Sequence, residues 1–542
     1  MKAICQTGSF ENFSMYNAIY VDKTELIYSL VSLPNRIFIS RPRRFGKSLT
    51  LDTIATLFET GVEPYFKGTW IYDKWTEPTY PVLRLNFLNF DKNSLEKFNN
   101  KLNSKITEFA ELNKVTTYKE KEESEDSIDH LLEQLRLENR QIVILIDEYD
   151  CQMTANINNE TLYKQFQEKI KSFYANIKDK FAIKFLGITG VTRLKDVSIF
   201  SVGSDINDIT NASAYSQMIG FTRDEIKKYY IDYLKLASSY ENNCSVDDVT
   251  DTQLESMLDM MAQNYDGYCF DEDYEKKVFS TWSVNKFFQT MIEKKKVQFG
   301  EYWYDNGGLP SILVNYLKTH ELNIFEYLDK DKFLKVSSDD FKNPTALTTI
   351  NQNVLMCQTG YLTLRSDLNK TSTVALGIPN GEIYKALNRL LANNIFKGNT
   401  DITDDYGRSL LEVGTVDDII NLFNSALNSV SYDNYPIVSE SSVQNMLKLY
   451  LLGAHQEVLS EVHEAKGRAD LVVNTDNRRI VFEFKYAKNE AEAKSKLSEA
   501  VEQIKTRDYG NILPKKNELI RIAAVFNADP KVRAFTENQI VP

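Results

Sequence analysis

Residues 36–50 read RIFISRPRRFGKSLT, and this stretch decides the fold of the first third of the chain. The apolar run Arg36 to Ser40 predicts a buried strand, and a helix is expected from Lys47 to about Glu59. A loop that joins a buried strand to a helix N-terminus presents backbone N–H groups and the helix dipole to a phosphate. The layout therefore predicts a phosphate-binding loop.

Three loop residues carry the expected chemistry. Gly46 lies where the backbone approaches the phosphates most closely, Lys47 reaches the terminal phosphates, and Ser48 offers its hydroxyl to Mg²⁺. A leading glycine is expected five positions before Gly46, where the sequence has Arg41. Because proline fixes φ near about −65°, Arg41-Pro42 gives the loop another tight path. Arg43 and Arg44 either contact phosphates or stabilise a neighbouring subunit or domain.

A pair of acids about 100 residues further on supports a nucleotide site. The apolar strand 142–146 ends in Asp147 and Glu148, and two carboxylates that leave a buried strand need a reason to be there. Asp147 is expected to hold Mg²⁺ through water, and Glu148 to polarise the water that attacks ATP. A solvated strand end would explain one acid but not its pairing with the loop. Thr189 ends strand 182–189 and is either a γ-phosphate sensor or a turn residue.

Strands and helices alternate through this region, which predicts an α/β fold with a parallel sheet covered on both faces. We expect a P-loop ATPase domain over residues 1–219. The expected strands are 36–40, 81–90, 142–146 and 182–189, and the expected helices are 47–59, 92–112, 127–138 and 158–177.

The centre of the chain has a different texture. Tyr-, Leu- and Lys-rich amphipathic stretches predict a helical subdomain over residues 220–345. Residues 346–430 suggest a small winged-helix-like unit, in which a helix precedes two β-like pieces, YLTLR and TVALG, that pair as a hairpin. A second α/β block is expected over residues 436–542.

This second block contains GRADLVVNTDNRRIVFEFKYA at residues 467–487, which reads as a β-hairpin. Residues i and i+2 of a strand share a face, so Glu483 and Lys485 converge with Asp470 of the opposing strand. Such a group binds Mg²⁺ between carboxylates and holds a hydrolytic water against a phosphodiester. The alternative is a half-exposed strand with a salt bridge.

Two further positions complete this hypothesis. Gln503, on the helix 490–507, contacts the metal-bound water or the backbone, or is simply an exposed helical residue. A third acid on a preceding helix would finish the metal site, and both Glu440 and Glu461 are available. The residues themselves do not choose between these two.

Composition limits the classes of protein. The 542 residues are 42% apolar and 26% charged, and no apolar run is long enough to span a bilayer, so no membrane partner is expected. Five widely spaced cysteines and an N-terminus without a signal-like core predict a cytoplasmic protein. The net charge is −12, but the part from Glu440 onward has 16 Lys/Arg against 15 Asp/Glu, so nucleic-acid contact would be local to it.

The chain resembles bacterial proteins that combine an AAA-ATPase-like domain with a C-terminal PD-(D/E)xK nuclease-superfamily domain. The motifs that carry this resemblance are YVDKTELI (20–27), SRPRRFGKSL (40–49), VILIDEYD (143–150), GITGVTRL (187–194), GFTRDEI (220–226), YDGYCF (265–270), QTGYLTL (358–364) and GRADLVV…IVFEFK (467–485).

The resemblance implies which residues form each site. It implies an ATP site made of Arg41, Pro42, Arg43, Arg44, Phe45, Gly46, Lys47 and Ser48 with Asp147 and Glu148. It also implies a nuclease motif at Asp470, Glu483 and Lys485, for which we take Glu440 as the remaining acid.

The leading hypothesis is an ATP-binding and ATP-hydrolysing protein whose nucleotide state controls a Mg²⁺-dependent nuclease that acts on DNA or RNA phosphodiesters, with DNA the expected partner over RNA. One rival is an ATP-driven switch whose C-terminal domain binds nucleic acid or protein without cleavage. Another is a regulator that binds DNA through residues 346–390, although this stretch contains few Lys and Arg. The sequence leaves open whether the protein is a homo-oligomer.

Overall fold

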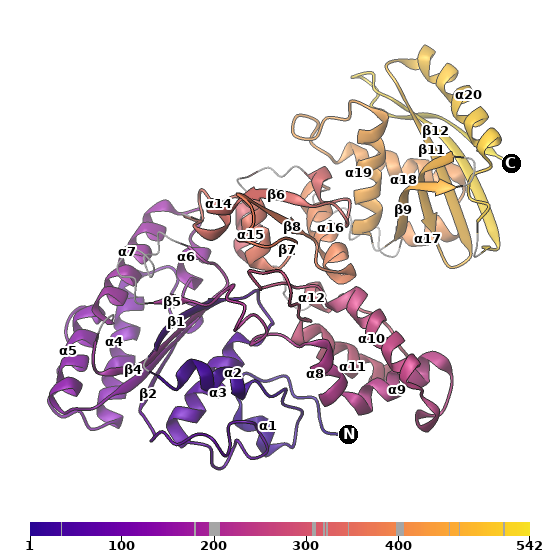
Figure 1. Ribbon diagram of the computed structural model, residues 1–542. Coiled ribbons are helices and arrows are strands. Elements are labelled where there is room, and N and C mark those ends of the chain that lie inside the picture. The colour runs from indigo at the N-terminus through magenta and orange to yellow at the C-terminus, as the bar shows by residue number, and fades with distance from the viewer. Residues whose placement is uncertain are drawn as a thin grey trace. The chain divides into compact units, whose positions relative to one another are not determined.

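A computed structural model gives the fold of the protein (Figure 1). It describes residues 1–33, 35–177, 180–194, 206–305, 311–317, 320, 324–344, 346–396, 406–454, 456–464, 467–512 and 515–542. The chain divides into two compact units, and neither is continuous in sequence. The first comprises Met1–His320 with Phe333–Ile383, and the second Glu321–Lys332 with Tyr384–Pro542.

The four expected domain ranges stay predictions. The boundary between the units falls inside the expected 346–430 unit, at Ile383 and Tyr384. Residues 195–205 of the expected ATPase domain and residues 397–405 of the expected 346–430 unit lie outside the described residues.

The N-terminal part of the first unit is an α/β layer structure. Its strands are β1 Asn35–Ser40, β2 Val82–Asn86, β3 Ile142–Asp147, β4 Ile183–Gly190 and β5 Asn207–Asp208. Its helices are α1 Glu11–Met15, α2 Thr24–Val31, α3 Lys47–Thr60, α4 Leu95–Leu112, α5 Ser124–Leu137, α6 Cys151–Ala155 and α7 Glu160–Ile177.

These strands form one parallel sheet in the order β2-β3-β4-β1-β5. Strand β4 therefore lies between β1, which leads into the loop, and β3, which carries the acids. The register pairs Ile39 with Thr189 and Ile146 with Ile188, so the carboxyl ends of the three strands lie level. The prediction of an α/β fold with a parallel P-loop sheet is confirmed.

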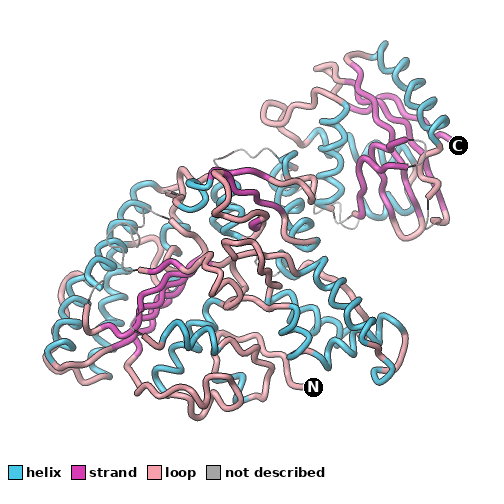
Figure 2. Tube along the Cα trace, viewed as in Figure 1, coloured by secondary structure: helices cyan, strands magenta, loops and turns pink. Residues whose placement is uncertain are grey.

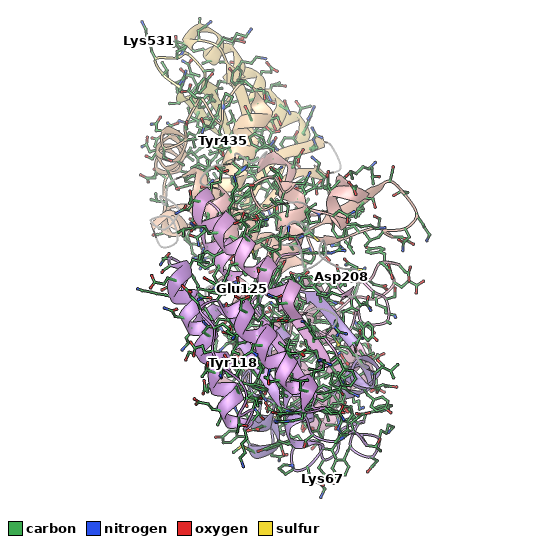
Figure 3. All side chains as sticks on the ribbon, turned by 90° about the vertical axis from the view of Figure 1, so that its left-hand side faces the viewer. Lys67, Tyr118, Glu125, Asp208, Tyr435 and Lys531 are labelled. Atoms are coloured by element: carbon green, nitrogen blue, oxygen red, sulfur yellow. The ribbon has the colours of Figure 1, made fainter. Side chains whose placement is uncertain are left out.

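Helices cover both faces of this sheet, as the central strands require because they are buried on both sides. Helix α3 packs on β3 and β4, and Phe58 of α3 contacts Phe185 of β4. Helices α4, α5 and α7 form the layer on the other face (Figure 1). Figure 3 looks directly onto these three helices, with Glu125 of α5 labelled.

The predicted strand 81–90 is too long. Strand β2 ends at Asn86, and a 3-10 turn, Phe87–Asn89, follows it. The Asn86 side chain accepts a hydrogen bond from the backbone N–H of Leu88, and this local bond competes with the continuation of the strand. Phe87 is still buried and packs edge-on against Phe90 and Phe98, so the apolar pattern reflects burial here rather than a strand.

The rest of the first unit is mostly helical. Its elements are α8 Arg223–Tyr229, α9 Ile231–Asn242, Val246–Asp248 (3-10), α10 Asp251–Tyr265, α11 Thr281–Lys294, α12 Tyr302–Asp305, α13 Ser311–Leu317, β6 Leu334–Ser337, α14 Ser338–Lys342, α15 Gln352–Thr359, β7 Thr363–Leu364 and β8 Thr373–Gly377. The predicted hairpin is confirmed, since β7 and β8 pair antiparallel. The sequence did not predict β6, which adds a third strand to β8 (Figure 2).

The second unit is built on another five-stranded sheet, in the order β13-β12-β11-β10-β9. Its elements are Ile324–Glu326 (3-10), most of α16 Gly381–Ile395, α17 Tyr406–Val413, α18 Val416–Asn428, α19 Glu440–Gly453, β9 Glu457–Glu464, β10 Gly467–Asn474, β11 Arg478–Ala487, α20 Glu490–Arg507, β12 Glu518–Asn527 and β13 Ala534–Val541. The predicted hairpin at 467–487 is confirmed as β10 and β11, which pair antiparallel.

Strand β11 lies between β10 and β12 and is buried over nearly its whole length. Helix α20 packs on β11, β12 and β13, and α19 also contacts β11. This double cover explains why Phe482, Phe484 and Glu483 are all inaccessible to solvent, although they point to alternate sides of the strand.

A short segment, 324–332, belongs to the second unit although it precedes the main part of that unit in the sequence. The carbonyl oxygen of Leu328 accepts hydrogen bonds from the Tyr384 hydroxyl at 2.9 Å and from Lys448 Nζ at 2.9 Å. The segment 324–332 is thus tied to α16 and α19, more than fifty residues later in the sequence.

Among the described residues, no helix combines the length and the apolar character needed to cross a bilayer. All five cysteines are free thiols.

Candidate functional sites

The phosphate loop has the backbone that its sequence predicts at its C-terminal end. Gly46 has φ of 106°, a left-handed conformation that glycine adopts without steric cost, and α3 begins at the next residue. Arg44 also has a positive φ, of 69°. The backbone therefore reverses twice between Pro42 and Lys47, and this tight path replaces the one that a leading glycine would give.

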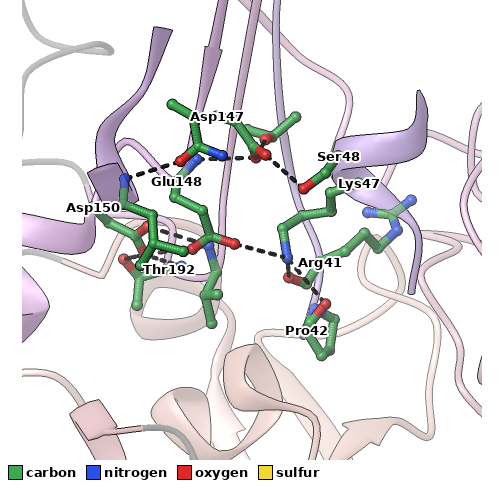
Figure 4. A network of polar contacts seen from close by, with 12 residues as sticks. Arg41, Pro42, Lys47, Ser48, Asp147, Glu148, Asp150 and Thr192 are labelled. Carbon is green, nitrogen blue, oxygen red and sulfur yellow. Dashed lines mark hydrogen bonds and ion pairs between the residues drawn. The ribbon is translucent and has the colours of Figure 1, made fainter. Parts of the chain in front are cut away.

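Lys47 lies at the centre of the site (Figure 4). Its side chain is buried, and Nζ donates to the carbonyl oxygens of Arg41 at 3.0 Å and Pro42 at 3.2 Å. The same nitrogen lies 3.9 Å from Glu148 Oε1. The ammonium is therefore held over the loop, within reach of an acid from the next motif.

Ser48 and Asp147 meet at the carboxyl edge of the sheet. The Ser48 hydroxyl donates to Asp147 Oδ2 at 2.6 Å, and the Thr189 hydroxyl donates to Asp147 Oδ1 at 2.5 Å. Asp147 is buried, so these bonds and the backbone N–H of Glu148 satisfy a carboxylate that water scarcely reaches. The structure thus brings together residues from β4, α3 and β3 that the sequence assigned to one site.

Glu148 has an unusual environment for a carboxyl group. Its φ is 54°, which for a residue other than glycine marks a backbone held in place by its surroundings. Burial raises the pKa of Glu148, and Lys47 opposes this rise, while Asp150 and Asp147 add to it. A carboxylate with a raised pKa beside a phosphate loop is suited to accept a proton from water.

Four side chains of the loop are engaged by other parts of the chain. Arg44 donates to the carbonyl oxygens of Tyr302 and Trp303 at 3.0 and 3.2 Å and lies over the Trp282 ring. Phe45 packs edge-on against Tyr268, Phe270 and Trp303. Pro42 packs against Gly360, where a Cβ atom would lie only 2.8 Å from the proline ring.

Arg41 is the fourth, and it is buried. Its guanidinium donates to the carbonyl oxygens of Ser40 at 2.9 Å and Thr210 at 2.6 Å and lies 4.2 Å from the centre of the Phe270 ring. Burial lowers the pKa of Arg41 to about 9, against the attraction of Asp208. Arg41 therefore contributes its backbone to the loop, because its side chain is bound to Ser40 and Thr210.

Arg43 differs from its neighbours. It lines the cavity beside the loop, and its positive charge favours the ionised form of Glu148. Within the described part of the chain it makes no hydrogen bond or ion pair. The cluster RPRRF thus joins the loop to segments 265–303 and 358–361, and leaves one arginine facing the site.

A cavity of about 410 Å³ adjoins the loop. Residues 43–50 and Glu148 form one end, and the other walls come from residues 5–8, 19–23, 218–221 and 281–285. The segment 5–8 precedes every motif in the sequence, and nothing in its composition marked it as part of a site.

Sequence reasoning also missed Asp150. Its buried carboxylate accepts hydrogen bonds from the backbone N–H and the hydroxyl of Thr192, at 2.7 and 2.6 Å, and from the N–H of Val191. Asp150 therefore fixes the turn that follows β4, where Figure 4 shows it beside Thr192. Arg193, in the same turn, is ion-paired with Asp208.

In the second unit, the two hairpin strands separate at the predicted carboxylates. Pairing between β10 and β11 begins at Leu471 and Phe482. Before that point the Asp470 carboxylate, rather than a backbone carbonyl, accepts the N–H of Phe484, at 2.8 Å. An acidic side chain thus takes over a ladder hydrogen bond and remains at the open end of the hairpin.

Lys485 links the other two acids. Its Nζ donates to Glu483 Oε1 at 2.8 Å, to Glu440 Oε1 at 3.2 Å and to the carbonyl oxygen of Phe484 at 3.1 Å. Glu483 is inaccessible to solvent, and its second oxygen, Oε2, is buried with no hydrogen-bond partner among the described residues. Burial raises the pKa of Glu483 to about 7, and the nearby Asp470 adds to this rise while Lys485 opposes it.

The carboxylates do not yet form a complete metal site. Within the described residues, no group of three His, Cys, Asp or Glu side chains is arranged to hold a metal ion. Glu440 begins helix α19 and touches Lys485, whereas Glu461 lies in strand β9 and not in a helix. Glu483 Oε2 is buried and accepts no hydrogen bond from the described residues, while Oε1 of the same carboxylate is paired with Lys485.

Three more side chains surround this group. Gln444, one turn after Glu440, donates to the backbone carbonyl of Asp470. Gln503 Nε2 donates to the Tyr509 hydroxyl at 3.4 Å, and Arg507 donates to the same hydroxyl at 2.8 Å. The charges of Glu483 and Asp470 contribute to a raised pKa of Arg507, after the effect of Tyr509 itself. Sequence reasoning selected Gln503 but missed Gln444 and Arg507.

Comparison with known proteins assigns both ends of the chain. Residues 5–200 match the AAA-ATPase-like family model, described as predicted AAA-ATPase, and residues 438–536 match a model of the PD-(D/E)XK nuclease superfamily. The resemblance stated from the sequence is therefore confirmed for these two regions.

One curated relative extends over nearly the whole length. An uncharacterized protein in the vnfD 5′ region of Azotobacter chroococcum mcd 1 is 26% identical over 529 residues, covering 94% of this chain and 93% of that protein.

Solved structures show weak overall likeness. A Walker-type ATPase of Pyrococcus abyssi has 11% identity and a TM-score of 0.35, covering 67% of this chain and 94% of its own. The Orc1 protein of Aeropyrum pernix in complex with DNA has 9% identity and a TM-score of 0.26, covering 67% and 91%. At these scores the fold assignment depends on the strand order and the family matches.

Proposed function

We propose that the first unit binds and hydrolyses ATP, and that its nucleotide state controls a nuclease in the second unit that acts on DNA or RNA phosphodiesters. The observation that supports the proposal most is the meeting of Lys47, Ser48, Asp147 and Glu148 at the mouth of a cavity of about 410 Å³. Residues that could bind the phosphates, an acid that could activate water, and a cavity that could hold the nucleobase then lie side by side.

Each residue has a role in the proposed ATP site. The backbone N–H groups at the start of α3 bind the phosphates, and the Lys47 ammonium exchanges the carbonyl oxygens of Arg41 and Pro42 for phosphate oxygens. Arg43 supplies further positive charge from the cavity wall. Thr189 is the proposed γ-phosphate sensor, and its hydroxyl donates to Asp147 beside the loop.

The donor set at Ser48 and Asp147 suits Mg²⁺, since a hydroxyl and a carboxylate are hard oxygen ligands in direct contact. When bound there, Mg²⁺ would neutralise phosphate charge during transfer. Glu148, with its raised pKa, would orient the attacking water and accept its proton.

In the second unit, Asp470 and Glu483 are the proposed metal ligands, with Glu440 as the third acid and Gln503 beside them. The buried and unpartnered Glu483 Oε2 supports this choice. A bound Mg²⁺ would activate water and stabilise charge on a phosphodiester. Lys485 would leave Glu440 and hold the attacking water or the scissile phosphate, as its ammonium already lies among the three oxygens.

A second candidate is an ATP-driven switch whose second unit binds nucleic acid or protein without cutting. Two observations favour it. Lys485 is ion-paired with both Glu483 and Glu440, and no three acids among the described residues converge as a metal site requires. Binding without cleavage in the presence of Mg²⁺ and Mn²⁺ would select this candidate.

A nuclease assay on the full chain tests the proposal, with single- and double-stranded DNA and RNA, Mg²⁺ or Mn²⁺, and with or without ATP. We expect cleavage that depends on metal, responds to ATP, and is lost in Glu483→Ala. Cleavage that survives Glu483→Ala points to a contaminant, and cleavage unaffected by ATP or by Lys47→Ala contradicts the proposed control of the nuclease by ATP.

A cytoplasmic location agrees with the five free thiols.

A further inference from the structure

The cavity beside the phosphate loop has apolar side chains in its walls as well as polar ones. The apolar ones include Phe13, Ile19, Val21, Ile219, Phe221 and Trp282, which suit contact with a flat apolar group. At about 410 Å³ it has room for a nucleobase with its ribose, and it begins at the loop residues that would hold the phosphates. On the proposed function, the base of the nucleotide enters this cavity.

Most polar side chains of the cavity are already engaged. Lys23 Nζ is bound to Glu225 at 2.6 Å and to the Gln217 carbonyl at 2.8 Å. The Tyr230 hydroxyl donates to Asn285 Oδ1 at 2.6 Å. These groups are satisfied within the protein and have little to offer a ligand.

Two side chains of the cavity differ: Arg43, which makes no hydrogen bond or ion pair among the described residues, and Gln6. The Gln6 Nε2 atom is buried and has no hydrogen-bond partner among the described residues, although the side chain lines the cavity. The next residue does not share this state, because the Thr7 hydroxyl oxygen accepts from the Ser9 backbone N–H at 3.1 Å and from Asn12 at 3.0 Å. A buried amide without a partner is costly, and a ligand that supplies the partner would relieve that cost.

We infer that the Gln6 side-chain amide recognises the nucleobase and makes the site selective for adenine. This inference rests on the proposed ATP site. An amide offers one donor and one acceptor side by side, and adenine presents the complementary acceptor N7 and donor N6–H on one edge. Guanine presents two acceptors, N7 and O6, on the same edge, so Gln6 could satisfy only one of them and would leave its own acceptor unpaired.

The expected selectivity follows from this mismatch. A site built to hydrogen-bond a ligand group discriminates against an analogue that lacks it, because buried polar groups are then left unpaired. Replacing Gln6 removes both the gain with adenine and the penalty with guanine. The preference for ATP over GTP should therefore fall by about three- to tenfold.

The test is calorimetric titration of the full chain with ATP and with GTP, in a Glu148→Gln background that slows hydrolysis. We expect Gln6→Leu to weaken ATP binding about tenfold and GTP binding less than about threefold. Gln6→Asn keeps the amide but shortens its reach, so its ATP affinity should lie between that of the parent protein and that of Gln6→Leu. Gln298→Leu, at an exposed glutamine outside the cavity, should change neither affinity.

Thermal unfolding of each variant shows whether it is folded. If Gln6→Leu does not fold, the comparison is made with Gln6→Asn, which retains the amide. An ATP to GTP ratio that is unchanged in the folded Gln6 variants, together with ATP binding that Lys47→Ala abolishes, overturns this inference and leaves the proposed function standing. If the parent protein binds neither nucleotide, the proposed function fails, and the inference fails with it.

Discussion

The Ser48 hydroxyl and the Asp147 carboxylate are in direct contact, at 2.6 Å, although 99 positions separate them in the sequence. Ser48 lies in the first turn of helix α3 and Asp147 ends strand β3, so the contact depends on the placement of β4 between β1 and β3. It brings a hydroxyl and a carboxylate together beside Lys47, which is what a phosphate-bound magnesium requires.

Replacing Glu148 by Gln should separate binding of ATP from its hydrolysis. The amide keeps the size of the side chain but cannot accept a proton, so we expect turnover to fall by about 100-fold or more while ATP affinity changes little. Steady-state phosphate release and nucleotide titration measure the two quantities. Glu111→Gln, at an exposed acid, is the control, and an unchanged turnover in Glu148→Gln would remove Glu148 from the mechanism.

The two arginines at positions 41 and 43 should respond in opposite ways. Arg41→Ala leaves the carbonyl oxygens of Ser40 and Thr210 without a donor, so we expect a loss of about 2–4 kcal/mol in stability. Arg43→Ala should leave the thermal midpoint unchanged and weaken ATP binding about tenfold. Thermal unfolding and nucleotide titration of both variants check this, and a stable Arg41→Ala protein with weak ATP binding would reverse the assignment.

Glu382, at the start of α16, should make the stability of the first unit depend on pH. Burial raises the pKa of Glu382 to about 8. The carboxylate accepts hydrogen bonds from the Ser283 hydroxyl and the Trp303 backbone N–H, and these bonds oppose the rise. Between about pH 4.5 and pH 8 the folded state holds a proton that the unfolded state has lost, so stability falls as pH rises through this window, by at most about 5 kcal/mol.

Glu382→Gln removes this titration, because the amide is neutral at every pH. We therefore expect the variant to gain thermal stability relative to the wild type as pH rises from 5 to 8, with the difference levelling off above pH 8. Glu293→Gln, at an exposed acid, should show no such trend. A difference between Glu382→Gln and wild type that is the same at pH 5 and pH 8 contradicts the expectation.

Lys485 should be needed for cleavage but not for binding of nucleic acid. Lys485→Ala removes the ammonium that touches Glu483 and Glu440, and we expect cleavage to fall by about 100-fold or more. Fluorescence anisotropy should show nearly unchanged DNA affinity. Lys488→Ala, at an exposed lysine just past the motif, should retain cleavage, and equal losses in both variants would argue for a general charge effect.

Arg507 should contribute to substrate binding in the same unit. It is fixed by the Tyr509 hydroxyl and lies close enough to Asp470 and Glu483 to interact with both charges. We expect Arg507→Ala to weaken DNA binding about tenfold, with a smaller salt dependence, while Lys505→Ala on the same helix has less effect. Salt-dependent anisotropy titrations distinguish the two, and identical curves would exclude a special role for Arg507.

The elements with strong local patterns were predictable. Strands β1, β3 and β4 are continuous apolar runs with polar residues at their carboxyl ends, so Lys47, Ser48 and Asp147 could be expected to lie close together before any fold was known. The hairpin β10–β11 was equally clear, because its polar turn separates two apolar runs.

Other features depend on distant partners, which no local pattern reveals. Arg41 sits in a motif that suggests phosphate contact, yet Thr210 and Phe270, far along the chain, bury its guanidinium. Gln6 becomes part of a site only because segments 218–221 and 281–285 close around it. Strand β6 is four residues long and exists because β8 pairs with it.

The segment 324–332 has a practical consequence for exchanging parts between relatives. Leu328 binds residues of α16 and α19, and α16 itself starts in the first unit, at Gly381, and ends in the second. A fragment that begins at Tyr384 would lack the carbonyl oxygen that holds Tyr384 and Lys448. The second unit is therefore not a cassette that recombination could move with a single crossover, and chimaeras between relatives should fold only when both of its segments come from the same parent.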